Sequence, residues 1–410
     1  MAYFSDAPLP STNRPVVITG MGIVTPLGRD LAENSAGLRA GRTAFSPVTL
    51  FDVSRQRVGT AGQVDLPDEP GKAWSRMDRG TRLALLAARQ ALAAAGRAGG
   101  EMPMVVGTSA AAMPIGEEYY QQALATTAHS SRQLRRVELY QAQRQMTDMA
   151  RELGVSGPIR IISNACASGA NAIGQAFHLV RSGRAEVVLA GGYDALCQLV
   201  FCGFDALQAL SPSGIPRPFD AARDGLALGE GAGFVVVESA AAAKARGARV
   251  IAEILGYGAA TDVHHLTQPH PLGDAALMTM QAACAMAGLA PEQIDYINSH
   301  GTGTVLNDVA EGHAIQRWAG EAVGKIKVSS TKSAIGHLLG GAGAVESVIA
   351  LLALEGQWLP ASLNVREADA VCSFDLVRTP REAQVHRVLT NSFGFGGANA
   401  TLIFGKEGLA

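Results

Sequence analysis

The chain has 410 residues, of which 48% are hydrophobic and 17% are charged. This balance excludes a disordered protein and fits a large enzyme with tightly packed elements. The formal net charge of -2 gives no overall attraction to DNA or RNA, so an acidic partner would have to bind a local basic patch.

The five cysteines are an odd number and show neither CxxC nor zinc-ligand spacing, which favours free thiols in a reducing cytoplasm. No basic segment followed by an apolar core opens the chain, and no uninterrupted apolar run approaches the ~20 residues of a membrane helix. No linker rich in proline, serine or charge divides the sequence, so we expect one compact unit.

Short β-branched runs alternate with alanine-rich stretches of helical period along the chain. This alternation predicts an α/β fold with buried sheets. In chain order, the pattern predicts a strand at 16–24, a helix at 82–96, strands at 104–109 and 159–163, a helix at 170–183, strands at 186–192, 234–239 and 249–258, a helix at 276–288, strands at 296–304 and 326–331, a helix at 343–355 and a strand at 400–405.

Two segments, 164–183 and 332–356, resemble each other weakly. Each places a reactive residue near the start of an alanine-rich helix and ends at glycine. We therefore expect two similar halves that meet near Gly256. Residues 1–255 would carry a nucleophilic cysteine, and residues 256–410 would carry two catalytic histidines.

Cys166 differs from the other cysteines in its setting. It follows the strand signal at 159–163 and precedes the helix signal at 170–183, so it lies on a sharp strand-to-helix turn. Such a turn exposes the side chain, and the backbone N–H groups of the helix N-terminus favour a thiolate and a lowered pKa. Cys197, Cys202, Cys284 and Cys372 lack such a turn and are interpreted as core residues.

Two of the nine histidines have a comparable context. His300 follows a strand signal and opens a loop rich in glycine and hydroxyl groups, and His337 lies between a strand and an alanine-rich helix. A metal site at His264, His265 and His270 is the alternative, but no carboxylate or thiolate at ligand spacing accompanies these three residues. The sequence therefore predicts no metal.

The motifs NACASG, INSHGTGT, KSAIGH and NSFGFGGAN occur in one order along the chain. Together they closely resemble the β-ketoacyl-acyl carrier protein synthases, nearest the type II elongating enzymes and the polyketide ketosynthases. The resemblance implies the thiolase fold, a five-layered αβαβα body with two similar halves, and usually a dimer. It implies no bound cofactor, because phosphopantetheine arrives on the acyl carrier protein.

By this resemblance, Cys166 would take the acyl chain as a thioester, with the backbone N–H groups of Cys166 and Phe393 forming the oxyanion hole. After a malonyl thioester loses carbon dioxide, His300 and His337 would stabilise the enolate. Lys332 would act with these histidines.

Other residues would support this chemistry. Glu346 would pair with Lys332, although the two could equally form an ordinary ion pair. The resemblance also assigns substrate-binding roles to Thr302 and Thr304, which would bind the phosphopantetheine arm, to Phe393, which would gate the acyl pocket, and to Phe395 and Ala110.

The sequence departs from the family pattern at the nucleophile, where Ala167 stands in place of threonine or serine, and throughout 107–145. The second segment resembles the part that shapes the acyl pocket and the dimer contact. Because Ala110 occupies a place where a bulkier residue is common, we hypothesise a roomy pocket suited to long or polyene-like chains. Basic residues that could meet an acidic carrier are Lys72, Arg76, Arg79, Arg135 and Arg136.

Three alternatives compete with a self-sufficient condensing enzyme. The chain could be the catalytic subunit of a heterodimer with a chain-length-factor-like partner. It could also be a non-catalytic chain-length partner, although such subunits typically lack the nucleophile that Cys166 supplies. A degradative thiolase is disfavoured, because two histidines in these motifs favour decarboxylation.

Overall fold

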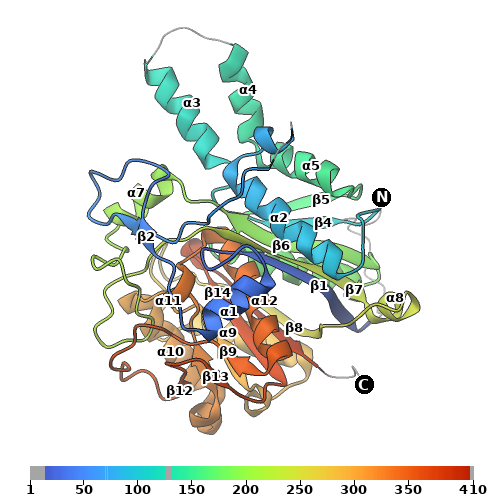
Figure 1. Ribbon diagram of the computed structural model, residues 1–410. Helices are drawn as coiled ribbons and strands as arrows, with labels where there is room; N and C mark the ends of the chain where they lie inside the picture. Colours follow the sequence, from blue (N-terminus) through green and yellow to red (C-terminus); the bar gives the residue numbers. More distant parts are fainter. Residues whose placement is uncertain (1–13, 70, 72, 126–130, 407–410) are drawn as a thin grey trace.

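The computed structural model describes residues 14–69, 71, 73–125 and 131–406. Its first half contains the large strands of one sheet and the helices around them (Figure 1). The elements are β1 (Val16–Val24), α1 (Leu31–Arg39), β2 (Ser46–Pro47), β3 (Thr60–Ala61), α2 (Arg79–Ala94), β4 (Met104–Gly107), α3 (Met113–Ala125), α4 (Ser131–Tyr140), α5 (Ala142–Leu153), β5 (Ile159–Ile162), α6 (Ser168–Arg181), β6 (Val187–Asp194), α7 (Gln198–Ala206), β7 (Gly231–Ser239) and α8 (Ala240–Ala245).

The second half repeats this arrangement with shorter strands. Its elements are β8 (Ala252–Thr261), α9 (Asp274–Ala287), β9 (Tyr296–Asn298), α10 (Val305–Ala319), β10 (Lys327–Ser329), α11 (Lys332–Ile335), α12 (Ala342–Gly356), β11 (Trp358–Leu359), β12 (Asp375–Leu376), β13 (Arg381–Glu382), β14 (Arg387–Phe393) and β15 (Ala398–Gly405).

The two halves have the same strand order and the same strand directions. The first half runs β5-β4-β6-β7-β1, and the second runs β10-β9-β14-β15-β8. In each, the first three strands are parallel and the last two join antiparallel. The repeat begins with β8 at Ala252, so the expected meeting point, Gly256, lies inside this strand.

Matching glycines let a helix lie directly on each sheet. A Cβ atom at Gly20 or Gly22 of β1 would lie 2.1 Å from a carbonyl oxygen of α2. At Gly256 and Gly258 of β8, the corresponding distances to carbonyl oxygens of α9 are 2.2 and 2.1 Å. Because real Cβ atoms do not approach so closely, only glycine allows this packing in both halves.

Strands β1 and β8 pair antiparallel, so the strands of the two halves form one continuous sheet, with β12 added at the β10 edge. Helices α6 and α12 form the central layer between its two halves. They touch through small residues, since a Cβ atom at Gly169 would lie 2.7 Å from the backbone nitrogen of Ala344. With α2 and α9 on the outer faces, the result is the five-layered thiolase fold that the resemblance implied (Figure 1). The stretch Leu339–Gly356 is apolar and long enough to cross a membrane, but 83% of it is buried in this core.

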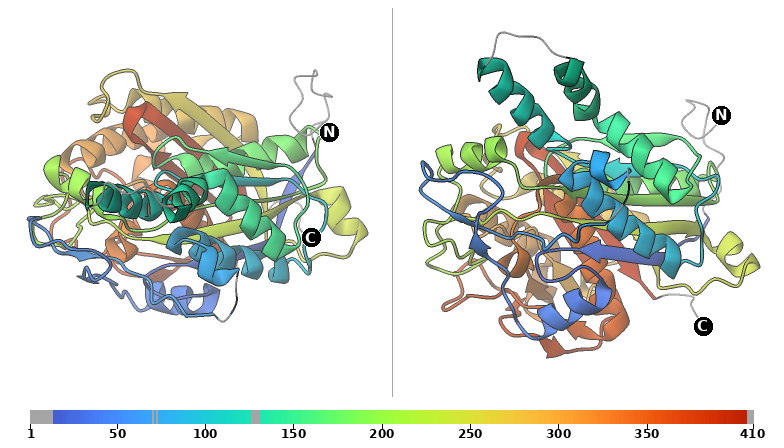
Figure 2. Two further views of the ribbon diagram at one scale, coloured as in Figure 1. Left: turned by 90° about the horizontal axis from the view of Figure 1, so that it is seen from above. Right: turned by 45° about the horizontal axis from the view of Figure 1, so that its top comes forward.

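Helices α3 and α4 form a hairpin that stands away from this body, as Figure 1 and the right view of Figure 2 show. Several of its exposed side chains are apolar, and Tyr120, Leu124 and Leu134 are 65%, 72% and 75% exposed. This hairpin lies in the segment 107–145 that departs from the family pattern.

Candidate active site

Cys166 lies on a sharp turn between β5 and α6, as the sequence predicted. The turn depends on Ala165, whose φ of 55° is in the left-handed region, and its carbonyl oxygen accepts bonds from the backbone and hydroxyl of Ser168 at 3.1 and 2.6 Å. Ser109 Oγ donates to the same carbonyl at 2.9 Å. Three hydrogen bonds therefore hold the residue before the nucleophile.

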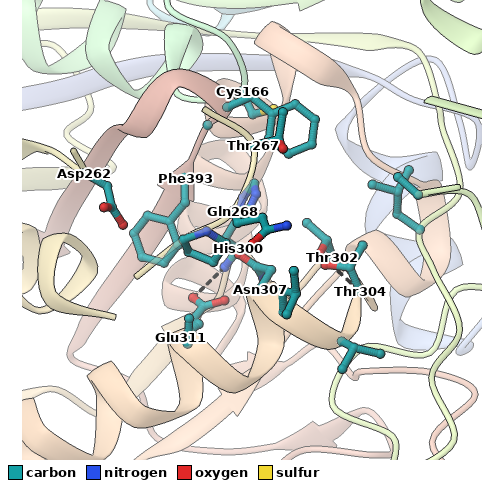
Figure 3. A pocket seen from close by; sticks show the side chains of 18 of the residues that line it. Cys166, Asp262, Thr267, Gln268, His300, Thr302, Thr304, Asn307, Glu311 and Phe393 are labelled. Carbon is teal, nitrogen blue, oxygen red and sulfur yellow. Dashed lines mark hydrogen bonds between the residues drawn. The ribbon is translucent and has the colours of Figure 1, made fainter. Parts of the chain in front are cut away.

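Cys166, His300 and His337 line one cavity of about 350 Å³ (Figure 3). Two of the side chains come from the second half of the chain and one from the first, so the cavity lies where the halves meet. Thr302, Thr304, Phe393 and Phe395 also line it, and Thr302 and Thr304 share a hydrogen bond of 2.8 Å. Sequence positions far apart are thus brought to one site.

Burial raises the pKa of the Cys166 thiol to about 11, against the attraction of Lys332 and a hydrogen bond from the backbone N–H of Phe395. The expectation of a lowered pKa is therefore wrong. The helix N-terminus favours the thiolate, but only 8% of the residue is exposed, and removing the charge from water costs more than the helix supplies.

The backbone N–H that points at the Cys166 sulfur belongs to Phe395. Phe393, which the resemblance assigned to the oxyanion hole, ends strand β14 and pairs with Asn399. This assignment is corrected, because the amide aimed at Cys166 comes from the turn after the strand. The Phe393 ring lies beside His300, with ring centroids 5.6 Å apart.

Phe395 presents a more exposed ring at the cavity than Phe393, to which the resemblance assigned the gate. Phe395 is 39% exposed and stacks on Phe204 of α7, with centroids 5.7 Å apart and planes inclined by 16°. Both rings line the cavity. Phe393 instead packs against the core cluster of the second half.

Both histidines accept a hydrogen bond at Nδ1. Leu339 N–H donates to Nδ1 of His337 at 2.9 Å, and Lys332 Nζ lies 3.3 Å from Nδ1 of His300. The Lys332 ammonium and the Leu339 backbone N–H can only donate. Nδ1 of each neutral imidazole must therefore be the acceptor, and the ring proton lies on Nε2. The two rings lie 5.3 Å apart, nearly perpendicular at 87°.

Burial keeps both imidazoles neutral. It lowers the pKa of His300 and of His337 well below the usual range, and the positive charge of Lys332 lowers both further. The cavity is therefore lined by two neighbouring imidazoles, each a neutral N–H donor.

Lys332 and Glu346 form an ion pair in the core, with side chains 1% and 2% exposed. Burial raises the pKa of Glu346 to about 7, although the Lys332 charge opposes this rise. The pair lies behind the histidines and does not line the cavity. Lys332 therefore contacts His300, which does line the cavity.

Ala110 does not line this cavity. It is buried in a separate apolar cluster with Leu196, Phe201 and Leu339, against which Phe204 packs. Phe204 therefore borders both the cavity around Cys166 and the cluster around Ala110.

Two carboxylates at the site were missed in the sequence. Glu311 of α10 lines the cavity and accepts the backbone N–H groups of His300 and Gly301 at 2.8 and 2.7 Å (Figure 3). Burial raises its pKa to about 7. Asp308, one turn earlier, accepts from Gly303 N–H at 3.2 Å. The sequence signal that could have identified Glu311 and Asp308 was their position eleven and eight residues after His300.

A third missed carboxylate, Asp194, joins the two halves. It accepts from Thr108 Oγ1 and Ala110 N–H of the first half at 2.6 and 3.0 Å, and from Gly340 N–H of the second half at 2.7 Å. Burial raises its pKa to about 6. The loop that carries Ser109 is therefore tied to the segment that follows His337.

In the part of the chain that the structure describes, no three His, Cys, Asp or Glu side chains are grouped to hold a metal ion. His264 and His270 approach each other, with ring centroids 5.2 Å apart, because their backbone N–H groups both donate to Asp262.

The four arginines of this set that the structure describes do not form one patch of exposed cations. Arg79 bonds to the fully buried Glu230, and Arg136 pairs with Glu118 at 3.4 Å. Arg76 and Arg135 are exposed, and Lys72 lies outside the described residues.

Two family models match this chain, one in each half of the fold. Residues 13–243 match the family model described as the N-terminal domain of beta-ketoacyl synthase, and residues 251–366 match that of its C-terminal domain. The 3-oxoacyl-[acyl-carrier-protein] synthase 2 of Synechocystis sp. is 38% identical over 412 residues, covering 95% of this chain and 98% of the relative.

Two solved structures share the fold along nearly the whole chain. The ishigamide ketosynthase/chain length factor has a TM-score of 0.89 and 35% identity, covering 97% of this chain and 100% of its own. A type II PKS acyl-carrier protein in complex with its ketosynthase, bound to the hexaketide, has a TM-score of 0.87 and 29% identity, with coverages of 96% and 100%. The chain therefore belongs to the β-ketoacyl synthase family, among the type II ketosynthases.

Proposed function

We propose that this protein catalyses decarboxylative Claisen condensation of an acyl thioester with a malonyl-acyl carrier protein, giving a β-ketoacyl-acyl carrier protein during fatty-acid or polyketide elongation. The observation that carries the proposal is the shared cavity of Cys166, His300 and His337, in which both imidazoles keep a proton on Nε2. The nucleophile suits the first half-reaction, acyl transfer, and the two neutral hydrogen-bond donors suit the second, decarboxylation and condensation.

In the first half-reaction, Cys166 Sγ attacks the acyl carbonyl and the bond to the carrier sulfur breaks. The backbone N–H groups of Cys166 and Phe395 would bind the oxyanion that forms. Because both histidines already hold a proton on Nε2, the thiol proton passes to the departing carrier thiolate. The products are an acyl-Cys166 thioester and a free carrier thiol.

In the second half-reaction, the malonyl carboxylate leaves as carbon dioxide and its bonding electrons form an enolate. The Nε2–H groups of His300 and His337 donate to the enolate oxygen, and these bonds strengthen as the charge develops. The enolate carbon then attacks acyl-Cys166 and the sulfur leaves as a thiolate, which takes a proton from solvent to restore the thiol. The β-ketoacyl product remains on the carrier. No bound cofactor takes part, since phosphopantetheine belongs to the incoming substrate.

The acyl chain would pass between Phe204 and Phe395 into the apolar cluster that contains Ala110. Movement of the exposed Phe395 would open this route, because its ring is held only by stacking on Phe204 among the ring contacts of the described residues. Thr302 and Thr304 would receive the phosphopantetheine arm. A long or polyene-like chain fits the small side chain at Ala110.

The partners in this proposal are an acyl carrier protein and a second ketosynthase-fold subunit in the cytoplasm. The exposed apolar side chains of the α3–α4 hairpin and the open edge of β5 support a dimer. A homodimer is the simplest arrangement, and a chain-length-factor-like partner would use the same surfaces.

Intact-mass and product analysis would test the function. Wild-type protein with acyl-carrier and malonyl-carrier substrates should gain the mass of the acyl group and release a β-ketoacyl product, and Cys166→Ala should do neither. Acylation of the wild type at another residue, or no adduct with any acyl carrier, would contradict the proposal.

A further inference from the structure

The α3–α4 hairpin is bonded to α7 through one carboxylate. Glu117 of α3 accepts the backbone N–H of Leu199 at 2.6 Å through Oε1 and that of Gln198 at 3.3 Å through Oε2. Gln198 and Leu199 are the first two residues of α7. Glu117 therefore binds the N-terminus of this helix from a different element.

Helix α7 has no cap of its own. Its N-cap residue, Cys197, makes no capping side-chain bond, and no acidic residue occupies the first turn. The first N–H groups of a helix need an acceptor, and a negative charge at this end is favoured by the helix dipole. Glu117 supplies both.

The other end of α7 carries the gate of the proposed acyl route. Phe204 stacks on Phe395, and the backbone N–H of Phe395 points at the Cys166 sulfur. Phe201, on the same helix, is fully buried and packs against Phe51 with centroids 5.6 Å apart. Because α7 is nine residues long, Phe204 lies only five residues after Leu199, about one and a half helical turns away.

The hairpin itself is weakly attached. None of the residues of α3 is buried, and the outer side chains described above are largely exposed. The polar contacts to α7 therefore contribute a larger share of the hairpin's attachment than they would in an apolar interface. Gln121 adds one weak contact, with its Nε2 at 3.4 Å from Gln198 Oε1.

We propose that Glu117 is a positioning residue for the Phe204–Phe395 gate and couples the α3–α4 hairpin to acyl loading of Cys166. This inference rests on the proposed condensing function. Glu117 touches neither substrate nor the reacting atoms. It fixes the first turn of α7 and thereby the ring that borders both the cavity and the Ala110 cluster.

Replacing Glu117 by alanine tests the coupling. Glu117→Ala should lower kcat/KM for acylation of Cys166 by long-chain acyl carrier about tenfold, the size expected for loss of a helix cap. Release of carbon dioxide from the malonyl carrier should not change, because His300 and His337 keep their contacts. Glu117→Gln retains one acceptor oxygen and should give an intermediate loss.

Glu118→Ala is the matched control. Glu118 neighbours Glu117 on α3, carries the same charge and pairs with Arg136 rather than with α7. It should acylate like the wild type. Thermal unfolding of each variant shows whether the fold is intact.

A double-mutant cycle separates positioning from general damage. Once Phe204→Ala has removed the gate ring, adding Glu117→Ala should cause no further loss of acylation. Three results would overturn the coupling. Glu117→Ala could cause the same loss with and without Phe204, it could leave acylation at the wild-type rate, or it could lower carbon dioxide release in parallel with acylation. No adduct even in wild type would instead overturn the proposed function, and the coupling with it.

Discussion

Lys332 Nζ lies 3.3 Å from His300 Nδ1 and forms a buried ion pair with Glu346. One ammonium therefore fixes the tautomer of a histidine and compensates a carboxylate that water does not reach. Because the second oxygen of Glu346 has no hydrogen-bond partner, the carboxylate depends heavily on this one cation.

Removal of that cation should destabilise the protein. Lys332→Ala should lower the free energy of unfolding by about 3–5 kcal/mol, since a buried charge loses its partner. The double variant Lys332→Ala/Glu346→Gln should recover part of this loss. Urea unfolding of the two variants measures the difference, and equal stabilities would contradict the importance of the pair.

Loss of either histidine should separate the two half-reactions. His300→Ala or His337→Ala should slow release of carbon dioxide about 10²–10³-fold, as expected for removing one donor to a developing oxyanion. Acylation of Cys166 should persist in both variants. Carbon dioxide release and intact mass can be measured on the same samples, and a variant that loses both activities equally would contradict the assignment.

The raised pKa of Cys166 predicts slow alkylation at neutral pH. Only the thiolate reacts, so the rate of modification by iodoacetamide should rise about tenfold per pH unit from pH 7 towards a midpoint near 11. The sign follows from burial, which favours the protonated thiol. Peptide mapping isolates Cys166 from the other cysteines, and a rate already at its maximum at pH 7 would show a lowered pKa.

Enlarging Ala110 should shorten the products. Ala110→Ile adds volume to a closed apolar cluster, and Ala110→Val adds less, so the shift in product length should be graded between them. The measurement is the chain-length distribution from a mixture of acyl carriers. An unchanged profile in Ala110→Ile would refute the roomy pocket at this position.

Arg79 should affect stability rather than carrier binding. Its guanidinium bonds to both oxygens of Glu230, whose side chain is fully buried. Arg79→Ala should cost about 3–5 kcal/mol of stability, whereas Arg76→Ala, at an exposed site, should cost little. Unfolding and carrier affinity measured side by side distinguish a structural arginine from a docking one.

Local patterns were enough to predict the turn at Cys166 and the loops of His300 and His337, because strand and helix periods on either side define each turn. The choice between Phe393 and Phe395 could not be made in this way. Both rings flank Gly394, and the amide of Phe395 lies in the turn between β14 and β15, where Gly396 and Gly397 have positive φ angles. That geometry depends on neighbouring β14 and β15.

Contacts between distant segments were harder to predict. Asp194, Glu311 and Glu117 have no distinctive motif, and each acts by accepting N–H groups from elements remote in sequence. The pKa of Cys166 was predicted in the wrong direction for the same reason. A helix N-terminus is visible in the sequence, whereas the packing that buries the sulfur is not.

The contact between α6 and α12 has a consequence for how the reaction is organised. In the proposed reaction, the first structural repeat carries the sulfur that holds the growing chain, and the second carries the imidazoles that stabilise the enolate. The interface between the two repeats therefore also separates the group that holds the acyl chain from the groups that act in decarboxylation. Neither repeat alone can complete a turnover, so the reaction belongs to their junction.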